Sequence, residues 1–430
     1  MKTPLAILNL WHQGAKTLVS VSGVAFALLL VFMQLGFMGA VSQTATNVLE
    51  SLKFDILIRA RDYLHLYEPG QIERKWLAIA EGTEGVAAAR PLWITIHNWR
   101  KLPTAAEALD ADHFETQYLP IAVMAFEPEV SVFNLPDVEA LVHNRALLRE
   151  NAILIDDSTQ VDYGPWSAYR FSSADIDRET EIGGRRFTIR GLFQLGTGLA
   201  ANGAVITSHW GFARISPWDV RTTASLGLVQ VPGDASDKQR VLQLLRARTA
   251  LGSEALLQGS ETPSWLSQFG RWLRGVEPPT ENGAVSVLSR EEALSREKTR
   301  WLWQTPIGLI FQLGVVLSLL VGAAIVYMIL STDVANRLPE YATLLAIGYS
   351  RRYLASIVMT QAVVLSGMGF LTAWGTAEVL YRLTYAFSNI PLMMDATRIF
   401  VVCMLGLLMC CFSGLLALRK LWKAEPASLF

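Results

Sequence analysis

The residue patterns that carry chemistry in the common enzyme classes are absent from this sequence. A phosphate-binding loop needs Gly-x-x-x-x-Gly-Lys-Ser/Thr, so that backbone amides and one lysine contact the phosphates. The two Lys-Thr pairs, at 16–17 and 298–299, follow Ala and Glu instead. No Gly-x-Ser-x-Gly elbow and no His-Glu-x-x-His pair occurs, and the six histidines are scattered singly. We therefore expect no catalytic residue, no cofactor and no metal on this chain.

The informative pattern lies in the segment 333–349. Pro339 suits the first turn of a helix and Gly348 the position just past its end, so a helix of about nine residues is expected between them. This helix carries Leu344 and Ile347, although basic residues flank it on both sides. Its apolar residues need a partner, which is either another protein or the headgroup region of a membrane. The helical periodicity of the segment does not distinguish a protein partner from a membrane surface.

The elements around this helix are expected to be membrane spans. Of the 430 residues, 51% are hydrophobic and only 17% are charged, against about a quarter charged in soluble domains. Because about 20 apolar residues cross a bilayer core, four stretches are long enough to span it: 18–40, 306–330, 354–378 and 398–418. The first exceeds the apolar core of a cleaved signal peptide, so we expect it to remain. The formal charge of −1 argues against a nucleic-acid partner.

The basic residues predict an orientation, because Lys and Arg accumulate on the cytoplasmic side of a membrane. With both termini cytoplasmic, eight basic residues of the short segments lie inside, and only Arg382 and Arg398 lie outside. The expected fold is an integral membrane α-helical protein with four transmembrane helices. Its N-terminal segment 1–17, loop 332–353 and tail 419–430 would be cytoplasmic, and 379–397 would be a short extracytoplasmic loop.

The remaining segment, 41–300, is expected to be a large extracytoplasmic α+β domain inserted between the first two spans. Cysteines occur only in the last span, so no disulfide is expected to hold it. Helices are predicted at 71–81 and at 237–250, the second capped by Ser236, and a loop at 258–284. Two stalk helices are expected, 41–49 and 289–303. Strands are predicted at 54–58, 92–96, 121–126, 186–193, 204–207 and 226–231.

The cytoplasmic loop resembles the Glu-x-x-x-Leu-x-Ala-x-Gly signature of the FtsX/MacB superfamily of ABC-transporter permeases, with Glu340, Leu344, Ala346 and Gly348 at the matching positions. In the outer domain, 191–196 and 203–208 look like the strand, glycine-rich turn and strand of the DevC branch, although a plain β-turn-β unit explains them equally well. Met328 and Glu425 depart mildly from that branch. Other segments that resemble it are 26–37, 305–311, 326–330, 333–334, 340–344, 418–421 and 425–427.

The resemblance implies a non-catalytic permease of a mechanotransmission exporter in the bacterial inner membrane, with its large domain in the periplasm. ATP and Mg²⁺ would bind a separate ATPase subunit, because the chain begins only about 17 residues before its first span. Expected partners are that ATPase, a membrane-fusion adaptor, an outer-membrane channel, membrane lipid and a second copy of the chain. The cargo would be a glycolipid, lipid or other amphiphile. The ATPase-coupling helix would comprise Pro339, Glu340, Tyr341, Leu344, Leu345, Ala346, Ile347 and Gly348.

Three alternatives stay open. The chain resembles an FtsX-like transmitter that regulates an extracytoplasmic hydrolase, or a lipoprotein-releasing permease of the LolC/LolE kind. The outer segment of about 260 residues favours an exporter over the transmitter. A membrane-anchored enzyme or sensor without an ATPase is the third alternative, and the missing nucleophile motifs and the loop helix argue against it.

Overall fold

The computed structural model describes residues 14–109, 116–196, 201–254, 285–336, 338–388 and 392–423. The chain divides into two compact units. The helical unit comprises Met1–Ala40 and Pro306–Phe430, and the outer unit comprises Val41–Thr305. The loop predicted at 258–284 lies outside the described residues, as do the start of the N-terminal segment and the end of the C-terminal tail.

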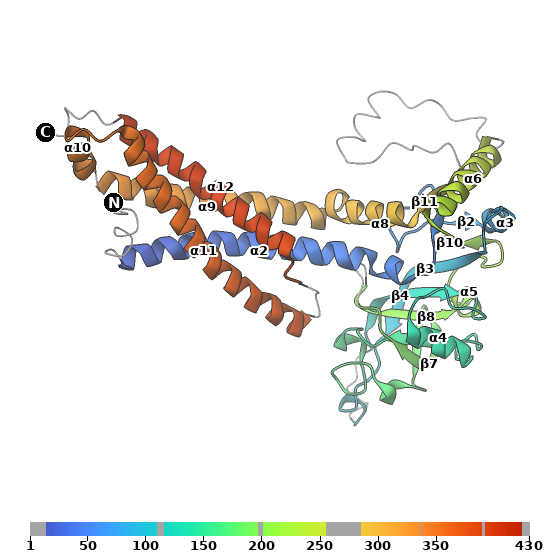
Figure 1. Ribbon diagram of the computed structural model, residues 1–430. Helices are drawn as coiled ribbons and strands as arrows, with labels where there is room; N and C mark the ends of the chain where they lie inside the picture. Colours follow the sequence, from blue (N-terminus) through green and yellow to red (C-terminus); the bar gives the residue numbers. More distant parts are fainter. Residues whose placement is uncertain are drawn as a thin grey trace. The chain divides into compact units, whose positions relative to one another are not determined.

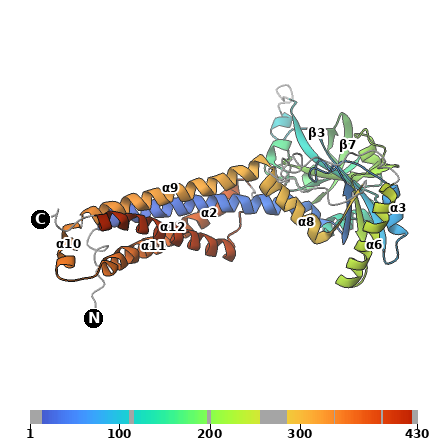
Figure 2. The same ribbon diagram turned by 90° about the horizontal axis from the view of Figure 1, so that it is seen from above.

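Among the residues that the structure describes, four helices are long and apolar enough to cross a membrane. They are α2 (Gly14–Ser51), α9 (Pro306–Asn336), α11 (Arg351–Ser388) and α12 (Ala396–Lys423), and each contains one of the four predicted spans. In the helical unit, α12 packs against α9 and α11 (Figure 2). A common apolar core joins all four helices, with Val24, Val326, Ala362 and Cys410 among its buried members.

Small residues bring these helices close together. A Cβ atom on Gly369 of α11 would overlap Val24, and one on Gly322 of α9 would overlap Met409 of α12. In lipid, where burial of apolar surface gives no driving force between helices, such close backbone approach is a main source of packing energy. The hydroxyl of Tyr381 also donates to the carbonyl oxygen of Phe32.

One helix end differs from the prediction. The segment 379–397 was expected to be a loop, but α11 continues to Ser388. The stretch has neither Gly nor Pro before Pro391, so nothing in it breaks a helix. An ion pair between Glu378 and Arg382, one turn apart, further supports the helix.

The outer unit is built on a nine-stranded sheet in the order β11-β1-β10-β3-β4-β8-β5-β7-β6. Figure 1 shows β3, β4, β8 and β7 following one another in this order. The strands are β1 (Ile56–Ala60), β3 (Ala88–Arg100), β4 (Tyr118–Phe126), β5 (Ala152–Asp156), β6 (Glu179–Ile182), β7 (Arg185–Phe193), β8 (Ala204–Ser208), β10 (Leu226–Gln230) and β11 (Val285–Ser289).

The long strand β3 divides this unit into two parts. Its first residues, as far as Leu92, pair with β10, and those from Trp93 onward pair with β4. Trp99 also pairs with Ile182 of β6, which closes the six strands from β3 to β6 into a ring. The domain therefore has a short open sheet, β11-β1-β10-β3, joined to a small closed barrel through one shared strand.

Helices cover the two faces of the open sheet. On one face, α3 (Lys75–Glu81) and α6 (Ala235–Glu254) contribute side chains such as Trp76 and Leu245 to an apolar core. A second core contains Val138 of α4 (Pro136–His143) and Ala293 of α8 (Arg290–Thr299). The short helix α5 (His209–Ala213) follows β8.

Each predicted strand overlaps an observed one, but three local predictions were wrong. The helix predicted at 71–81 begins only at Lys75, because the short strand β2 (Ile72–Glu73) pairs with β9 (Thr223–Ala224). Asp234, not Ser236, caps α6, since its Oδ1 accepts the Ser236 and Asp237 amides at 3.0 and 3.1 Å.

The third correction concerns 191–196 and 203–208. These segments are strands, as expected, but they do not form a β-turn-β unit. β5 lies between β7 and β8, pairing parallel with the first and antiparallel with the second. The pairing order depends on contacts with a strand about 40 residues earlier in the chain, which no local pattern reveals.

Candidate functional site

The predicted loop helix is present as α10 (Leu338–Ala346). Gly348 follows it with φ +104°, a backbone conformation that side chains of L-residues rarely adopt. The Tyr349 amide donates back to the Leu344 carbonyl at 3.0 Å, which is the closing hydrogen bond of a Schellman motif. The sequence signal for the helix end is therefore confirmed, and only glycine fits that position without strain.

One face of α10 packs on its own unit. Tyr341 is 3% exposed and contacts a core formed by Val334 of α9 with Leu354 and Val358 of α11, and Leu344 packs against the same core. Two of the residues expected to receive the ATPase thus hold α10 against the spans. Tyr341 is buried there and Leu344 is partly buried.

The opposite face of α10 is exposed. Glu340, Thr343 and Ile347, spaced three and four residues apart, are all exposed on it, and Ile347 is 70% exposed. Pro339 and Gly348 are exposed at its two ends. The side chains of Leu345 and Ala346 lie outside the described part of the structure. Thr343 was missed by sequence reasoning, although the helical period from Glu340 indicates it.

The connection from α10 to α11 is short and ordered by specific contacts. The ring of Tyr349 stacks on Tyr353, with centroids 5.0 Å apart. Ser350 caps α11, because its hydroxyl accepts the Tyr353 amide at 3.3 Å.

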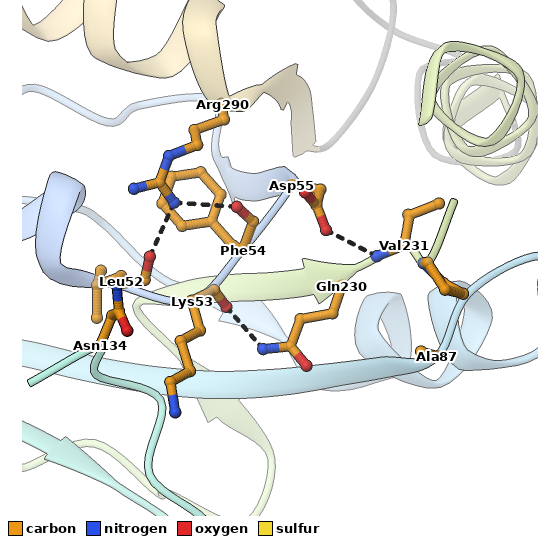
Figure 3. Close-up of a pocket in the computed structure, with 10 residues that line it drawn as sticks. Leu52, Lys53, Phe54, Asp55, Ala87, Asn134, Gln230, Val231 and Arg290 are labelled. Carbon is orange, nitrogen blue, oxygen red and sulfur yellow. Dashed lines mark hydrogen bonds between the residues drawn. The ribbon is translucent and has the colours of Figure 1, made fainter. Parts of the chain in front are cut away.

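Within the outer unit, Arg290 at the start of α8 holds the end of α2. Its guanidinium donates to the carbonyl oxygens of Leu52 and Phe54 at 2.8 and 3.1 Å and lies over the Phe54 ring (Figure 3). It also donates to the Glu50 carbonyl oxygen at 2.7 Å. A cation at the C-terminal carbonyls of a helix is favourable because those groups carry partial negative charge. This contact borders an open, polar hollow of about 590 Å³.

Further along α8, a buried carboxylate gathers three donors. Glu297 is 1% exposed and accepts the Tyr63 hydroxyl at 2.8 Å, the Leu66 amide at 3.2 Å and the Trp301 indole at 3.0 Å. Burial, together with the nearby Glu297 carboxylate, raises the pKa of Tyr63 well above its usual range, so the phenol stays protonated and donates. The contact joins α8 to the loop after β1.

The helix expected at 289–303 is interrupted. α8 ends at Thr299, a single π-helical turn follows (Arg300–Gln304), and Thr305 is extended, with φ −103° and ψ 152°. Thr305 precedes Pro306 of α9, and a residue before proline is disfavoured in the helical conformation. The prediction of one continuous helix into the second span was therefore wrong.

A second buried carboxylate lies at the end of β5. Asp156 is fully buried and accepts the amides of Ser158, Leu195 and Gly196 at 3.1, 3.2 and 2.9 Å, yet burial raises its pKa to about 6. The side-chain amide of Asn47, on α2, donates to the Leu195 carbonyl. The sequence analysis predicted no strand at 152–156, so it did not identify Asp156 as a buried carboxylate.

Comparison with known proteins concerns mainly the helical unit. Residues 313–426 match the family model described as FtsX-like permease C-terminal. This range contains α10, α11, α12 and most of α9. No curated protein matches the sequence significantly. Among the described residues no three His, Cys, Asp or Glu side chains gather as a metal site.

Two solved structures resemble the chain weakly. One is the extracellular domain of the noncanonic ABC-type transporter YknZ from Gram-positive bacteria, with 12% identity and a TM-score of 0.30 over 45% of this chain and 93% of that one. The other is the periplasmic region of MacB from Actinobacillus actinomycetemcomitans, with 7% identity and a TM-score of 0.33 over 56% and 92%. The family match covers the part of the chain that carries α10.

Proposed function

We propose that this chain is the permease subunit of a non-canonical ABC transporter and that α10 receives a separate ATPase subunit. The observation that carries the proposal is the FtsX-like match over 313–426, together with the exposed Glu340, Thr343 and Ile347 face of α10 within it. FtsX-like permeases are membrane subunits that work with an ABC ATPase. An exposed isoleucine offers such a partner an apolar contact next to a negatively charged side chain.

The proposed topology follows the basic residues. Both termini and α10 would be cytoplasmic, and the outer unit would lie in the periplasm, with α2, α9, α11 and α12 in the inner membrane. This places α10 on the side where ATP is available. Two copies of the chain would assemble with two ATPase subunits.

Transmission of the ATPase stroke is proposed to run mainly through α2. This helix is uninterrupted from Gly14 to Ser51, and Arg290 and Asn47 attach its end to the sheet and barrel of the outer unit. The break at Thr305 weakens the earlier expectation of two rigid stalks. We propose that the π-helical turn and Thr305 act as a hinge, while α2 transmits the motion driven by the ATPase.

A function in export would also require a surface on the outer unit to which an adaptor binds. Side chains exposed on neighbouring loops provide a candidate, including Leu109 at 91% and Tyr169 at 84% exposure. Backbone hydrogen bonds tie these loops together, from Leu102 to Tyr163 and from Ala105 to Trp166. We propose that a periplasmic adaptor docks here and that an outer-membrane channel completes the path of a glycolipid, lipid or other amphiphile.

The deciding experiment is co-purification of the tagged full chain with its candidate ATPase in detergent. Glu340→Lys and Ile347→Ala are expected to reduce ATPase capture and permease-dependent ATP hydrolysis about tenfold, the loss typical of an interface contact worth over 1 kcal/mol. Glu129→Lys, a matched charge reversal on an exposed residue of the outer unit, should leave capture unchanged. Equal capture by all three variants, each folded, would refute the proposed role of α10.

A further inference from the structure

A tight turn at 65–68, in the loop after β1, contains a histidine that acts as a hydrogen-bond acceptor. The Glu68 amide donates to the His65 carbonyl oxygen at 2.9 Å, and the two residues form an isolated β-bridge. Inside the turn, Nδ1 of the His65 ring accepts the amide of Tyr67, two residues further on, at 3.2 Å. Tyr67 is a buried residue, and the His65 ring supplies the acceptor for its amide.

Asparagine and aspartate are the usual residues at the first position of such a turn, because their side-chain oxygen accepts the amide two residues later. In this turn the ring of His65 takes that role. A neutral imidazole has one acceptor nitrogen, whereas a protonated imidazole has none. The hydrogen bond to the Tyr67 amide therefore exists only while His65 is neutral.

The turn is attached to the end of α8 and to the π-helical turn that follows it. The Leu66 amide donates to the Glu297 carboxylate at 3.2 Å. The His65 ring contacts the Trp301 ring, with centroids 5.3 Å apart and planes inclined by 43°. The Trp301 indole in turn donates to Glu297 at 3.0 Å. Opening of the turn 65–68 would thus remove a contact from the junction between α8 and the π-helical turn.

The groups around His65 act on its protonation in opposite directions. Burial lowers the pKa of His65, the carboxylates of Glu68 and Glu297 raise it, and the charge of Arg300 lowers it. Burial is the largest of these effects, so the pKa lies below the usual value of 6.5. The neutral ring is therefore favoured in the folded protein. Its contribution to stability is present above pH 6.5 and is lost as the pH falls through the lowered pKa.

We propose that His65 is an acid-sensitive latch: protonation of its ring breaks the hydrogen bond to the Tyr67 amide, opens the turn 65–68 and withdraws the Leu66 amide from Glu297. Histidine suits this role because its charge changes between pH 5 and 8. The outer unit would in this way respond to the pH of the compartment that it faces. The latch goes beyond the proposed transporter function and does not depend on the ATPase.

The test is hydrogen exchange of the purified full chain in detergent, measured by mass spectrometry from pH 7.5 to pH 5.0 without any ATPase. Labelling times are scaled to cancel the pH dependence of chemical exchange. In wild type, the corrected exchange of peptides that contain 65–68 should rise about tenfold over this range, as for the loss of one hydrogen bond. Peptides from β4 serve as an internal reference and should show no such rise.

Three variants identify the group responsible. His65→Asn keeps an acceptor two residues before Tyr67 but does not titrate, so exchange at 65–68 should stay slow at both ends of the pH range. His65→Ala removes the acceptor, so exchange should be about tenfold faster than in wild type at pH 7.5 and should not change with pH. His143→Asn, the matched change at an exposed histidine in the last turn of α4, should behave as wild type.

Asp156, whose pKa is about 6, also titrates in this range and is present in every one of these variants. A rise in wild type that persists in His65→Asn would be assigned to Asp156 or another group and would overturn the proposal. Corrected exchange in wild type that stays constant or falls at low pH would also overturn it, since attraction of the protonated ring to Trp301 would produce that result. The wild-type series with its internal reference can therefore overturn the proposal without any variant.

Discussion

Replacing Glu297 by alanine should destabilise the outer unit more than any other single change on α8. The substitution removes the acceptor of the Tyr63 hydroxyl, the Leu66 amide and the Trp301 indole at once. Each unsatisfied buried donor costs about 1–3 kcal/mol. Because water enters part of the space that the side chain vacates, we expect a total loss of about 3–5 kcal/mol.

Two comparisons separate this hydrogen-bonding role from a general effect on the helix. Glu297→Gln keeps the shape and one acceptor oxygen, and the Tyr63 hydroxyl can rotate to accept from the new amide, so the cost should be about 1–2 kcal/mol. Glu291→Ala removes an exposed carboxylate from the first turn of the same helix and should cost less than about 1 kcal/mol.

The assay is chemical unfolding of the full chain in detergent, followed through Trp fluorescence, with hydrogen exchange to locate the effect. Amides in 63–67 should exchange faster in Glu297→Ala, because the Leu66 amide has lost its acceptor. If Glu297→Ala and Glu291→Ala unfold at the same denaturant concentration, or exchange at 63–67 stays unchanged, the buried carboxylate does not hold this loop.

Three further predictions concern other buried positions. The pKa of Asp156 in the folded protein, about 6, lies above the value of 3.8 for a free carboxyl. Protonation of Asp156 therefore adds about 3 kcal/mol to the free energy of unfolding. This contribution is fully present below pH 3.8 and is lost as the pH rises through 6. Unfolding titrations from pH 4 to 7 should show this loss in wild type and not in Asp156→Asn. Gly164 has φ +86° and lies against the Leu102 carbonyl, so Gly164→Ala should lower the free energy of unfolding in denaturant by about 2–4 kcal/mol. Gly184 has φ +76° but faces open space, so Gly184→Ala should lower it less. Tyr341→Ala should lower stability by about 3–5 kcal/mol through a cavity, while the exposed Thr343→Ala costs under about 0.5 kcal/mol; equal thermal unfolding of the two would contradict the packing of α10.

Local patterns predicted the elements well and their neighbours poorly. The runs 121–126, 186–193 and 204–207 correspond to β4, β7 and β8, because alternation and branched side chains are local properties. That β5 separates β7 from β8 could not be predicted in this way, since strand order is decided by which apolar faces fit together across the whole domain.

The same division applies to the helix boundaries. Pro339 and Gly348 marked α10 within a residue, because both act on their own backbone. The start of α3 was misplaced by pairing with β9, and the expected stalk at 289–303 ends in a π-helical turn before Thr305. The first error arises because pairing with a distant strand overrides local helix preference. The second arises because Thr305 precedes Pro306, which disfavours the helical conformation at Thr305.

By itself, the sequence determined the four apolar stretches, the α+β character of the segment between the first two, and the existence of α10, because hydropathy, period and turn chemistry act over a few residues. Only the tertiary structure decided which residues of α10 are buried and which are exposed. Tyr341 and Leu344 pack on α9 and α11, whereas Glu340, Thr343 and Ile347 are exposed. Likewise, Glu297 and Asp156 are ordinary acidic residues in the sequence, and they become buried acceptors only because donors from distant segments converge on them.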